Sequence, residues 1–154
     1  MKRFKLFIWI EKSNSMKGYE FVDITTADIA FIAYGKTLSE LFSNAAIAMF
    51  EVIVDMNSVE KKEERVVEVE GSDLESLMFN WLNNLLVFVD SEGLVFSSFD
   101  VNVDEKNMKL KAVCRGERID KSRHEVRTQV KAATYHKMKI ERNDVWKAQV
   151  ILDI

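Results

Sequence analysis

The first half of the chain contains a stretch of apolar residues with the spacing of an amphipathic helix. Across residues 38–55 these residues follow the i, i+3, i+4, i+7 rule, which places them on one face of a helix. They are Leu38, Leu41, Phe42, Ala45, Met49, Phe50 and Ile53. Thr37 and Glu40 stand at the spacing of a capping box, so the pattern predicts a helix that begins at residue 38.

A second helical stretch covers residues 73–90. Its apolar residues have the same spacing, Ser72 and Glu75 repeat the capping-box pattern, and Gly93 follows the end. The stripe is rich in leucine, methionine and tryptophan, and we interpret it as part of the hydrophobic core rather than as a cofactor site.

The rest of the chain alternates between apolar and polar residues with period two, which is typical of β-strands. One such strand is expected in the apolar stretch "IAFIAYG". The others are expected at 64–71, 96–104, 107–116, 124–136, 137–142 and 146–154. The charged run "EKKEER" at 60–65 is interpreted as a solvated loop.

Because these strands do not alternate regularly with helices, we predict an α+β fold. Two helices would pack on a mostly antiparallel β-sheet in a single compact domain. Turn residues in "VDEKNMK" and "ERNDVW" predict two antiparallel hairpins. Residues 1–15, which end within a polar break that follows Glu11, are interpreted as an N-terminal extension of unknown role, and residues 16–154 as the domain.

The composition of the chain makes several classes of function less favourable. The 154 residues are 47% apolar, with no proline and a formal net charge of −3, so no overall positive field favours strong direct binding to nucleic acid. The apolar stretch near the N-terminus is too short for a signal peptide or a membrane span. Cys114 is the only cysteine and is interpreted as a buried small side chain. We therefore expect a cytoplasmic protein without a membrane association.

The sequence lacks the common catalytic signatures: a phosphate-binding glycine loop, paired cysteines for zinc, a GxSxG turn and an HExxH helix. With only two histidines, a histidine-rich metal site is excluded. His124 is interpreted as a surface residue at a strand start, and His136 as a packed or edge residue. No organic cofactor is expected, and the protein is interpreted as a non-enzyme.

Acidic residues near strand ends are the remaining candidates for a site. Asp28 lies directly before an apolar strand, and Asp153 lies one residue before Ile154, the last residue of the sequence. If these two strands are neighbours, both side chains and the carboxylate at Ile154 would supply oxygen ligands for calcium, magnesium or manganese. The alternative is that Asp28 serves in a turn or cap and Asp153 is solvated.

The order of these segments resembles the archease family. The resemblance covers residues 19–154 and rests on four stretches, of which the last two are the most specific. They are "YEFVDITTADIAFIAYGKTLSELFSNAAIAMFEVI", "VEVEGSDLESLMFNWLNNLLVFVDSEGLVFSSFDV", "RHEVRTQVKAATYHKMKI" and the closing "ILDI".

The resemblance implies a non-enzymatic activator of the RtcB-type RNA ligase in tRNA splicing. Archeases promote guanylylation of this ligase and its multiple turnover. The family's acidic, metal-binding pocket would be formed here by Asp28, Asp153 and Ile154, and Lys131 would take part in activation. As an alternative, the resemblance implies a chaperone-like modulator of a tRNA methyltransferase or another RNA-processing enzyme. A metal-dependent hydrolase is disfavoured, because no nucleophile or general base accompanies the two aspartates.

One position departs from the family pattern. Thr25 stands where the family usually has a histidine. A hydroxyl is a weaker ligand than imidazole for borderline metals, so we expect any site to favour hard cations such as calcium or magnesium and to bind them less tightly. Lys131 shares its predicted strand with Arg127 and Gln129, and the alternation of that strand would place all three on one face.

Overall fold

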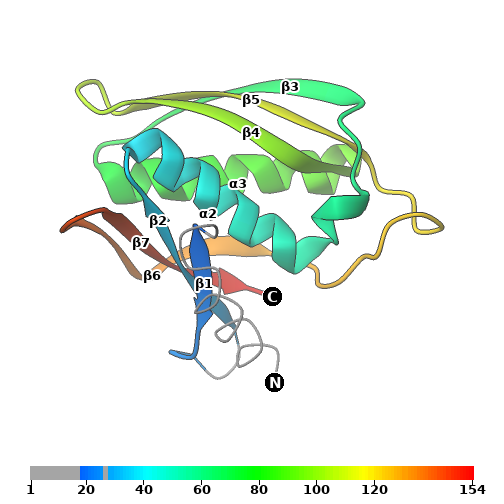
Figure 1. Ribbon diagram of the computed structural model, residues 1–154, viewed down its shortest axis with the longest axis horizontal. Helices are drawn as coiled ribbons and strands as arrows, with labels where there is room; N and C mark the ends of the chain where they lie inside the picture. Colours follow the sequence, from blue (N-terminus) through cyan, green and yellow to red (C-terminus); the bar gives the residue numbers. More distant parts are fainter. Residues whose placement is uncertain (1–17, 26–27) are drawn as a thin grey trace.

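A computed structural model describes residues 18–25 and 28–154 of the chain. The proposed extension, residues 1–15, lies outside the described residues. Two helices lie between two antiparallel sheets, as Figure 1 shows. The helices are α2 (Leu38–Ile53) and α3 (Leu74–Glu92), and a short 3-10 turn, η1 (Met56–Ser58), follows α2. No helix in this part of the chain combines the length and the apolar character needed to span a membrane.

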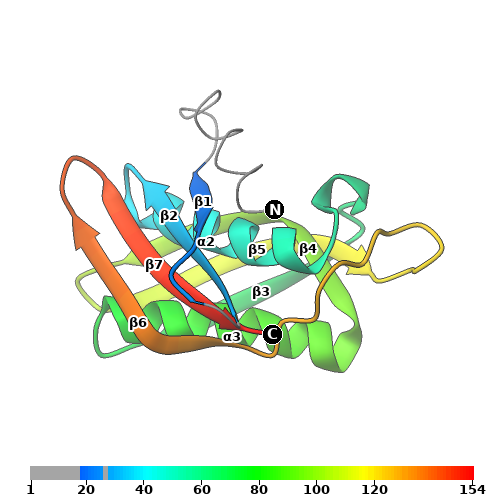
Figure 2. The same ribbon diagram turned by 90° about the horizontal axis from the view of Figure 1, so that it is seen from below.

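The strands divide into a four-stranded and a three-stranded sheet. The four-stranded sheet has the order β1-β2-β7-β6, and its strands run side by side in Figure 2. They are β1 (Tyr19–Val22), β2 (Ile29–Gly35), β7 (Trp146–Asp153) and β6 (Ala132–Arg142). The other sheet has the order β3-β5-β4, with β3 (Glu63–Glu70), β5 (Lys109–Arg118) and β4 (Leu94–Asp104). The predicted α+β class and both hairpins are confirmed, and the strands form two sheets rather than one.

Helix α2 begins as predicted. The Thr37 hydroxyl accepts a hydrogen bond from the Glu40 N–H at 3.1 Å, and the Glu40 carboxylate accepts one from the Lys36 N–H at 2.7 Å. The first bond satisfies a backbone donor that the first turn of a helix leaves open, and the second holds the residue before the cap. The helix ends two residues earlier than predicted, because Val54 is extended and forms a β-bridge with Val126.

Helix α3 has a different cap from the predicted one. The expected pair of Ser72 and Glu75 is wrong, because Asp73 and Ser76 form the capping box one residue later. The Asp73 carboxylate accepts the Ser76 N–H at 2.7 Å, and the Ser76 hydroxyl lies 3.1 Å from the Asp73 nitrogen. Glu75 is thereby left to accept the backbone N–H of Ile140 in β6 at 3.1 Å.

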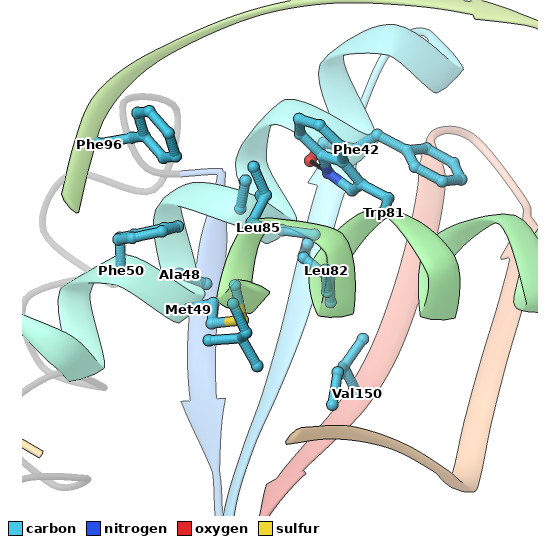
Figure 3. Packing of buried hydrophobic residues seen from close by; sticks show 14 of the residues in the cluster. Phe42, Ala48, Met49, Phe50, Trp81, Leu82, Leu85, Phe96 and Val150 are labelled. Atoms are coloured by element: carbon cyan, nitrogen blue, oxygen red, sulfur yellow. Dashed lines mark hydrogen bonds between the residues drawn. The ribbon is translucent and has the colours of Figure 1, made fainter. Parts of the chain in front are cut away.

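The core lies between the sheets and is built mainly by the two helices (Figure 3). Trp81 of α3 is fully buried, and its indole N–H donates to the carbonyl of Phe42 in α2 at 2.9 Å. Met49, Leu82 and Val150 are also fully buried in this cluster. The apolar stripe of the second helix is therefore part of the core, as predicted.

Two strand predictions are wrong at their boundaries. Residues 124–131 are not a strand, and the predicted strands 124–136 and 137–142 are parts of one strand, β6. Its pairing with β7 is irregular between Thr134 and Lys139. The run 60–65 is only partly a loop, because β3 begins at Glu63.

Side chains from the helices form hydrogen bonds with one edge strand of each sheet. The Ser39 hydroxyl of α2 accepts the N–H of Val103 in β4 at 2.9 Å. The Asn83 amide of α3 both accepts the N–H and donates to the carbonyl of Ala133 in β6, each at 3.0 Å. An edge strand with occupied backbone groups is a poor template for an added strand, so these contacts protect part of the β4 and β6 edges.

Candidate functional site

The pairing of β2 with β7 brings the two predicted aspartates to the same end of the four-stranded sheet. Ile29 pairs with Leu152 in the antiparallel register. Asp28 comes directly before Ile29 and Asp153 directly after Leu152, so the next positions of the two neighbouring strands are both acidic. Both residues are half-buried. The strand adjacency on which the predicted site depends is therefore confirmed.

Lys131 reaches the same end of the sheet through its backbone. Its N–H donates to the Asp153 carbonyl at 2.7 Å, and the next residue, Ala132, pairs with Asp153. The prediction that Lys131 shares a strand face with Arg127 and Gln129 is wrong, because 124–131 is an irregular segment rather than a strand. The Lys131 side chain is exposed, and it forms no ion pair with a described residue.

The donors available at this end of the sheet are oxygens. Asp28 and Asp153 contribute carboxylates, and Ile154 packs its side chain against the core, which holds its backbone beside them. Carboxylate and carbonyl oxygens suit calcium, magnesium and manganese better than softer metals. Within 18–25 and 28–154, no group of three His, Cys, Asp or Glu side chains is arranged to hold a metal ion. A cation bound here would therefore take no more than two ligands from such side chains, namely those of Asp28 and Asp153.

The segment that leads to Lys131 is anchored by a buried pair that the sequence did not reveal. His124 was expected at the surface, but it is 4% exposed, and its Nε2 lies 3.0 Å from the Glu117 carboxylate. Its Nδ1 accepts the N–H of Asp120 at 2.8 Å, so Nε2 carries the proton and donates to Glu117. The pair joins the end of β5 to the irregular segment.

Glu117 is a charged group held in a buried place. Burial by itself raises the pKa of its carboxyl, but the Glu60 N–H, His124 and Arg123 donate hydrogen bonds that lower the pKa to about 2. Lys62 lies 3.7 Å away and adds a second positive charge. A carboxylate satisfied in this way fixes its partners, and it is a structural anchor rather than a proton donor near neutral pH.

Cys114 and His136 are not assembled into a nucleophilic site. Cys114 is fully buried in the middle of the three-stranded sheet, and burial raises the pKa of its thiol to about 12. The prediction of a buried small side chain is confirmed. His136 is exposed in the irregular part of β6, an edge strand of the other sheet, so of the two predicted roles, packed or edge, the structure supports the edge role.

The fold and the site together define a small α+β protein with two helices between two antiparallel sheets and an acidic end on the larger sheet. Residues 19–154 match the model of the Archease protein family (MTH1598/TM1083). The chain belongs to the archease family, and the resemblance seen in the sequence is thereby confirmed.

Several relatives are similar to this protein over most of the chain. "Protein archease" of Pyrococcus abyssi is 52% identical over 143 residues, which are 90% of this chain and 100% of that protein. "Protein archease" of Sulfurisphaera tokodaii is 52% identical over 126 residues, 82% of this chain and 90% of the relative. The solution structure of Methanobacterium thermoautotrophicum protein 1598 is similar to this one, with a TM-score of 0.79 and 48% sequence identity. The match covers 90% of this chain and 100% of the chain of protein 1598.

Proposed function

We propose that this protein is a non-enzymatic activator of an RtcB-type RNA ligase, which promotes guanylylation of the ligase and its multiple turnover in tRNA splicing. The observation that carries the proposal is the position of Asp28 and Asp153 at the paired ends of β2 and β7. Membership of the archease family supports it. The acidic end of the sheet, with the Lys131 backbone bonded to Asp153, would contact the ligase near its guanylylation site.

The same end of the sheet is proposed to hold a divalent cation. Asp28, Asp153 and the carboxylate at Ile154 would be its ligands, and hard oxygen donors favour calcium, or magnesium and manganese. When bound, such a cation supplies positive charge that stabilises phosphate oxygens during nucleotidyl transfer. The two aspartates would hold the cation in position, and the exposed Lys131 amine would be accessible to the ligase or the nucleotide.

Turnover of the ligase with excess RNA tests this proposal. A split tRNA substrate is incubated with the cognate ligase, GTP and manganese, with and without this protein. The wild-type protein is expected to convert one round of ligation into many. Asp28→Ala and Asp153→Ala are expected to lose the stimulation, with unchanged circular dichroism and, in the absence of divalent cations, unchanged thermal unfolding.

The chain offers a matched control for these variants. Asp144 is an exposed aspartate in the turn before β7, at the other end of the same strand from Asp153. Asp144→Ala should stimulate ligation like the wild type. Full stimulation by both Asp28→Ala and Asp153→Ala would reject the site. Absence of stimulation by the wild type would reject the ligase as partner and direct attention to solubility assays with a tRNA methyltransferase.

A further inference from the structure

An exposed aromatic stack lies where β6 is irregular. The rings of Tyr135 and Phe79 are parallel, with centroids 4.1 Å apart and 5° between their planes. Phe79 comes from α3 and is half-buried, whereas Tyr135 is 51% exposed. The pair therefore presents an aromatic surface to solvent, supported from below by a second ring.

The backbone on both sides of this stack is already occupied. Asn83 bonds the N–H and carbonyl of Ala133, and Glu75 accepts the N–H of Ile140. An added β-strand is therefore disfavoured along this edge. Between Ala133 and Ile140, the surface available for binding consists of the ring of Tyr135 and the side chains that follow it.

A histidine and a positively charged lysine follow Tyr135. His136 and Lys137 are both exposed, and Lys137 has a φ of 53°. Lys131 and Lys139, four residues to either side of Tyr135, are exposed as well. Lys139 lies 3.6 Å from the carboxylate of Glu141, so the charges of these two side chains partly cancel. This part of β6 is locally basic in a chain whose net charge is −3.

We propose that the Tyr135–Phe79 stack, together with His136 and Lys137, binds a base and an adjacent phosphate of single-stranded RNA. The inference rests on the proposed function, because the ligase substrate would supply that RNA. A base stacks on an aromatic side chain with little dependence on sequence, and nearby cations attract the backbone. Tyr135 comes four residues after Lys131, a separation of at most about 13 Å in an extended chain, so the RNA would approach the acidic end of the sheet.

The surroundings favour RNA over a protein partner. A protein hot spot is normally surrounded by contacts that exclude water from it. Here the described large apolar side chains that are exposed besides Tyr135 are Val66, Val87 and Val126, and they belong to other elements. Val87 is eight residues along α3 from Phe79, which is about 12 Å. The open, basic surroundings of Tyr135 suit a charged, planar ligand better than an apolar one.

Binding to RNA alone is the first test. Isotope-labelled full-length protein is titrated at low salt with a single-stranded oligoribonucleotide of ten adenosines, and backbone amide shifts are followed by NMR. Shifts should move at Tyr135, His136 and Lys137 with a Kd at or below about 1 mM. The wild type and Tyr135→Phe should bind alike, whereas Tyr135→Ala should bind about tenfold more weakly, equivalent to about 1.4 kcal/mol. Absence of shifts at these residues, or equal binding by Tyr135→Ala, would overturn the proposal.

The second test determines whether the Tyr135–Phe79 stack binds RNA or the ligase. Guanylylation of the ligase with GTP requires no RNA, so Tyr135→Ala should stimulate it fully while raising the KM for split tRNA about tenfold. Lys137→Asn, which suits a positive φ, should also raise this KM, and Lys106→Asn in the β4–β5 turn is the matched control. An equal loss of guanylylation by Tyr135→Ala would assign the stack to the ligase interface instead. Lack of stimulation by the wild type would reject the proposed function but leave the titration result standing.

Discussion

Lys131 and Asp153 are joined through their backbones, since the Lys131 N–H donates to the Asp153 carbonyl at 2.7 Å. This bond fixes where the irregular segment meets β6, and it does not depend on either side chain. The Lys131 amine and the Asp153 carboxylate take no part in this bond, so substitution of either side chain leaves it in place. The contribution of each side chain to activation can therefore be measured with alanine variants.

Lys131→Ala is expected to lose most of the stimulation of the ligase while leaving stability within about 0.5 kcal/mol of the wild type, as for other surface substitutions. The measurements are ligation turnover and urea unfolding. Lys106→Ala, an exposed lysine of the β4–β5 turn, is the control and should change neither. If Lys131→Ala stimulates normally, the amine has no part in activation.

The cation proposal predicts a stability change that depends on the aspartates. A ligand that binds only the folded state stabilises it by about 2.7 kcal/mol at a concentration one hundred times its Kd. Calcium, magnesium or manganese should therefore raise the Tm of the wild type, and the effect should vanish in Asp28→Asn and Asp153→Asn. Asp144→Asn should respond like the wild type. The same rise in all four proteins would place the cation elsewhere.

The sequence predicted the helices well because their signals are local. Thr37 and Glu40 mark the start of α2, and the apolar spacing marks the buried face. The cap of α3 was misplaced by one residue because Ser72 and Asp73 are both good capping residues, and spacing alone does not rank them. The division of the strands into two sheets was not predicted, because strand order depends on long-range packing.

The candidate site was predictable for a similar reason. Asp28 and Asp153 are conspicuous because each adjoins an apolar strand, and only the adjacency of the two strands had to come from the structure. Glu117 and His124 gave no such signal. They meet because an irregular segment folds back onto the end of β5, and period-two patterning extended a strand through that segment where none exists.

The Glu117 anchor predicts a specific pH dependence of stability. Its folded-state pKa is lowered from the ordinary value of 4.5 to about 2. A lowered pKa means that the stabilisation is fully present above about pH 4.5 and is lost as the pH falls towards 2. The free energy of unfolding of the wild type, measured in urea, should therefore decrease as the pH falls through this range. Glu117→Gln should lose less stability over the same range, and at pH 6 it should be less stable than the wild type by about 2 kcal/mol.

A surface carboxylate provides the comparison for this anchor. Glu64 pairs with Arg115 at 3.1 Å, but its side chain is 57% exposed, and exposed ion pairs contribute little. Glu64→Gln should change stability at pH 6 by less than about 0.5 kcal/mol. Similar stability losses for Glu64→Gln and Glu117→Gln would show that burial does not distinguish the two carboxylates.

Two glycines of the three-stranded sheet region should respond to alanine for different reasons. A Cβ added at Gly116 would lie 1.9 Å from the carbonyl oxygen of Val95 and 2.7 Å from the Cα of Phe96, both backbone atoms of the neighbouring strand β4. Since β4 cannot move away without breaking its pairing with β5, Gly116→Ala should lower the free energy of unfolding by about 3 kcal/mol.

At Gly93 an added Cβ meets open space, but φ is 66°, so Gly93→Ala should lower the free energy of unfolding by about 1–2 kcal/mol. Thermal unfolding measures both, and Gly93→Asn should recover part of its loss because asparagine tolerates this conformation, whereas Gly116→Asn should not. Recovery at both positions would mean that backbone conformation, rather than the close approach of β4, decides the effect at Gly116.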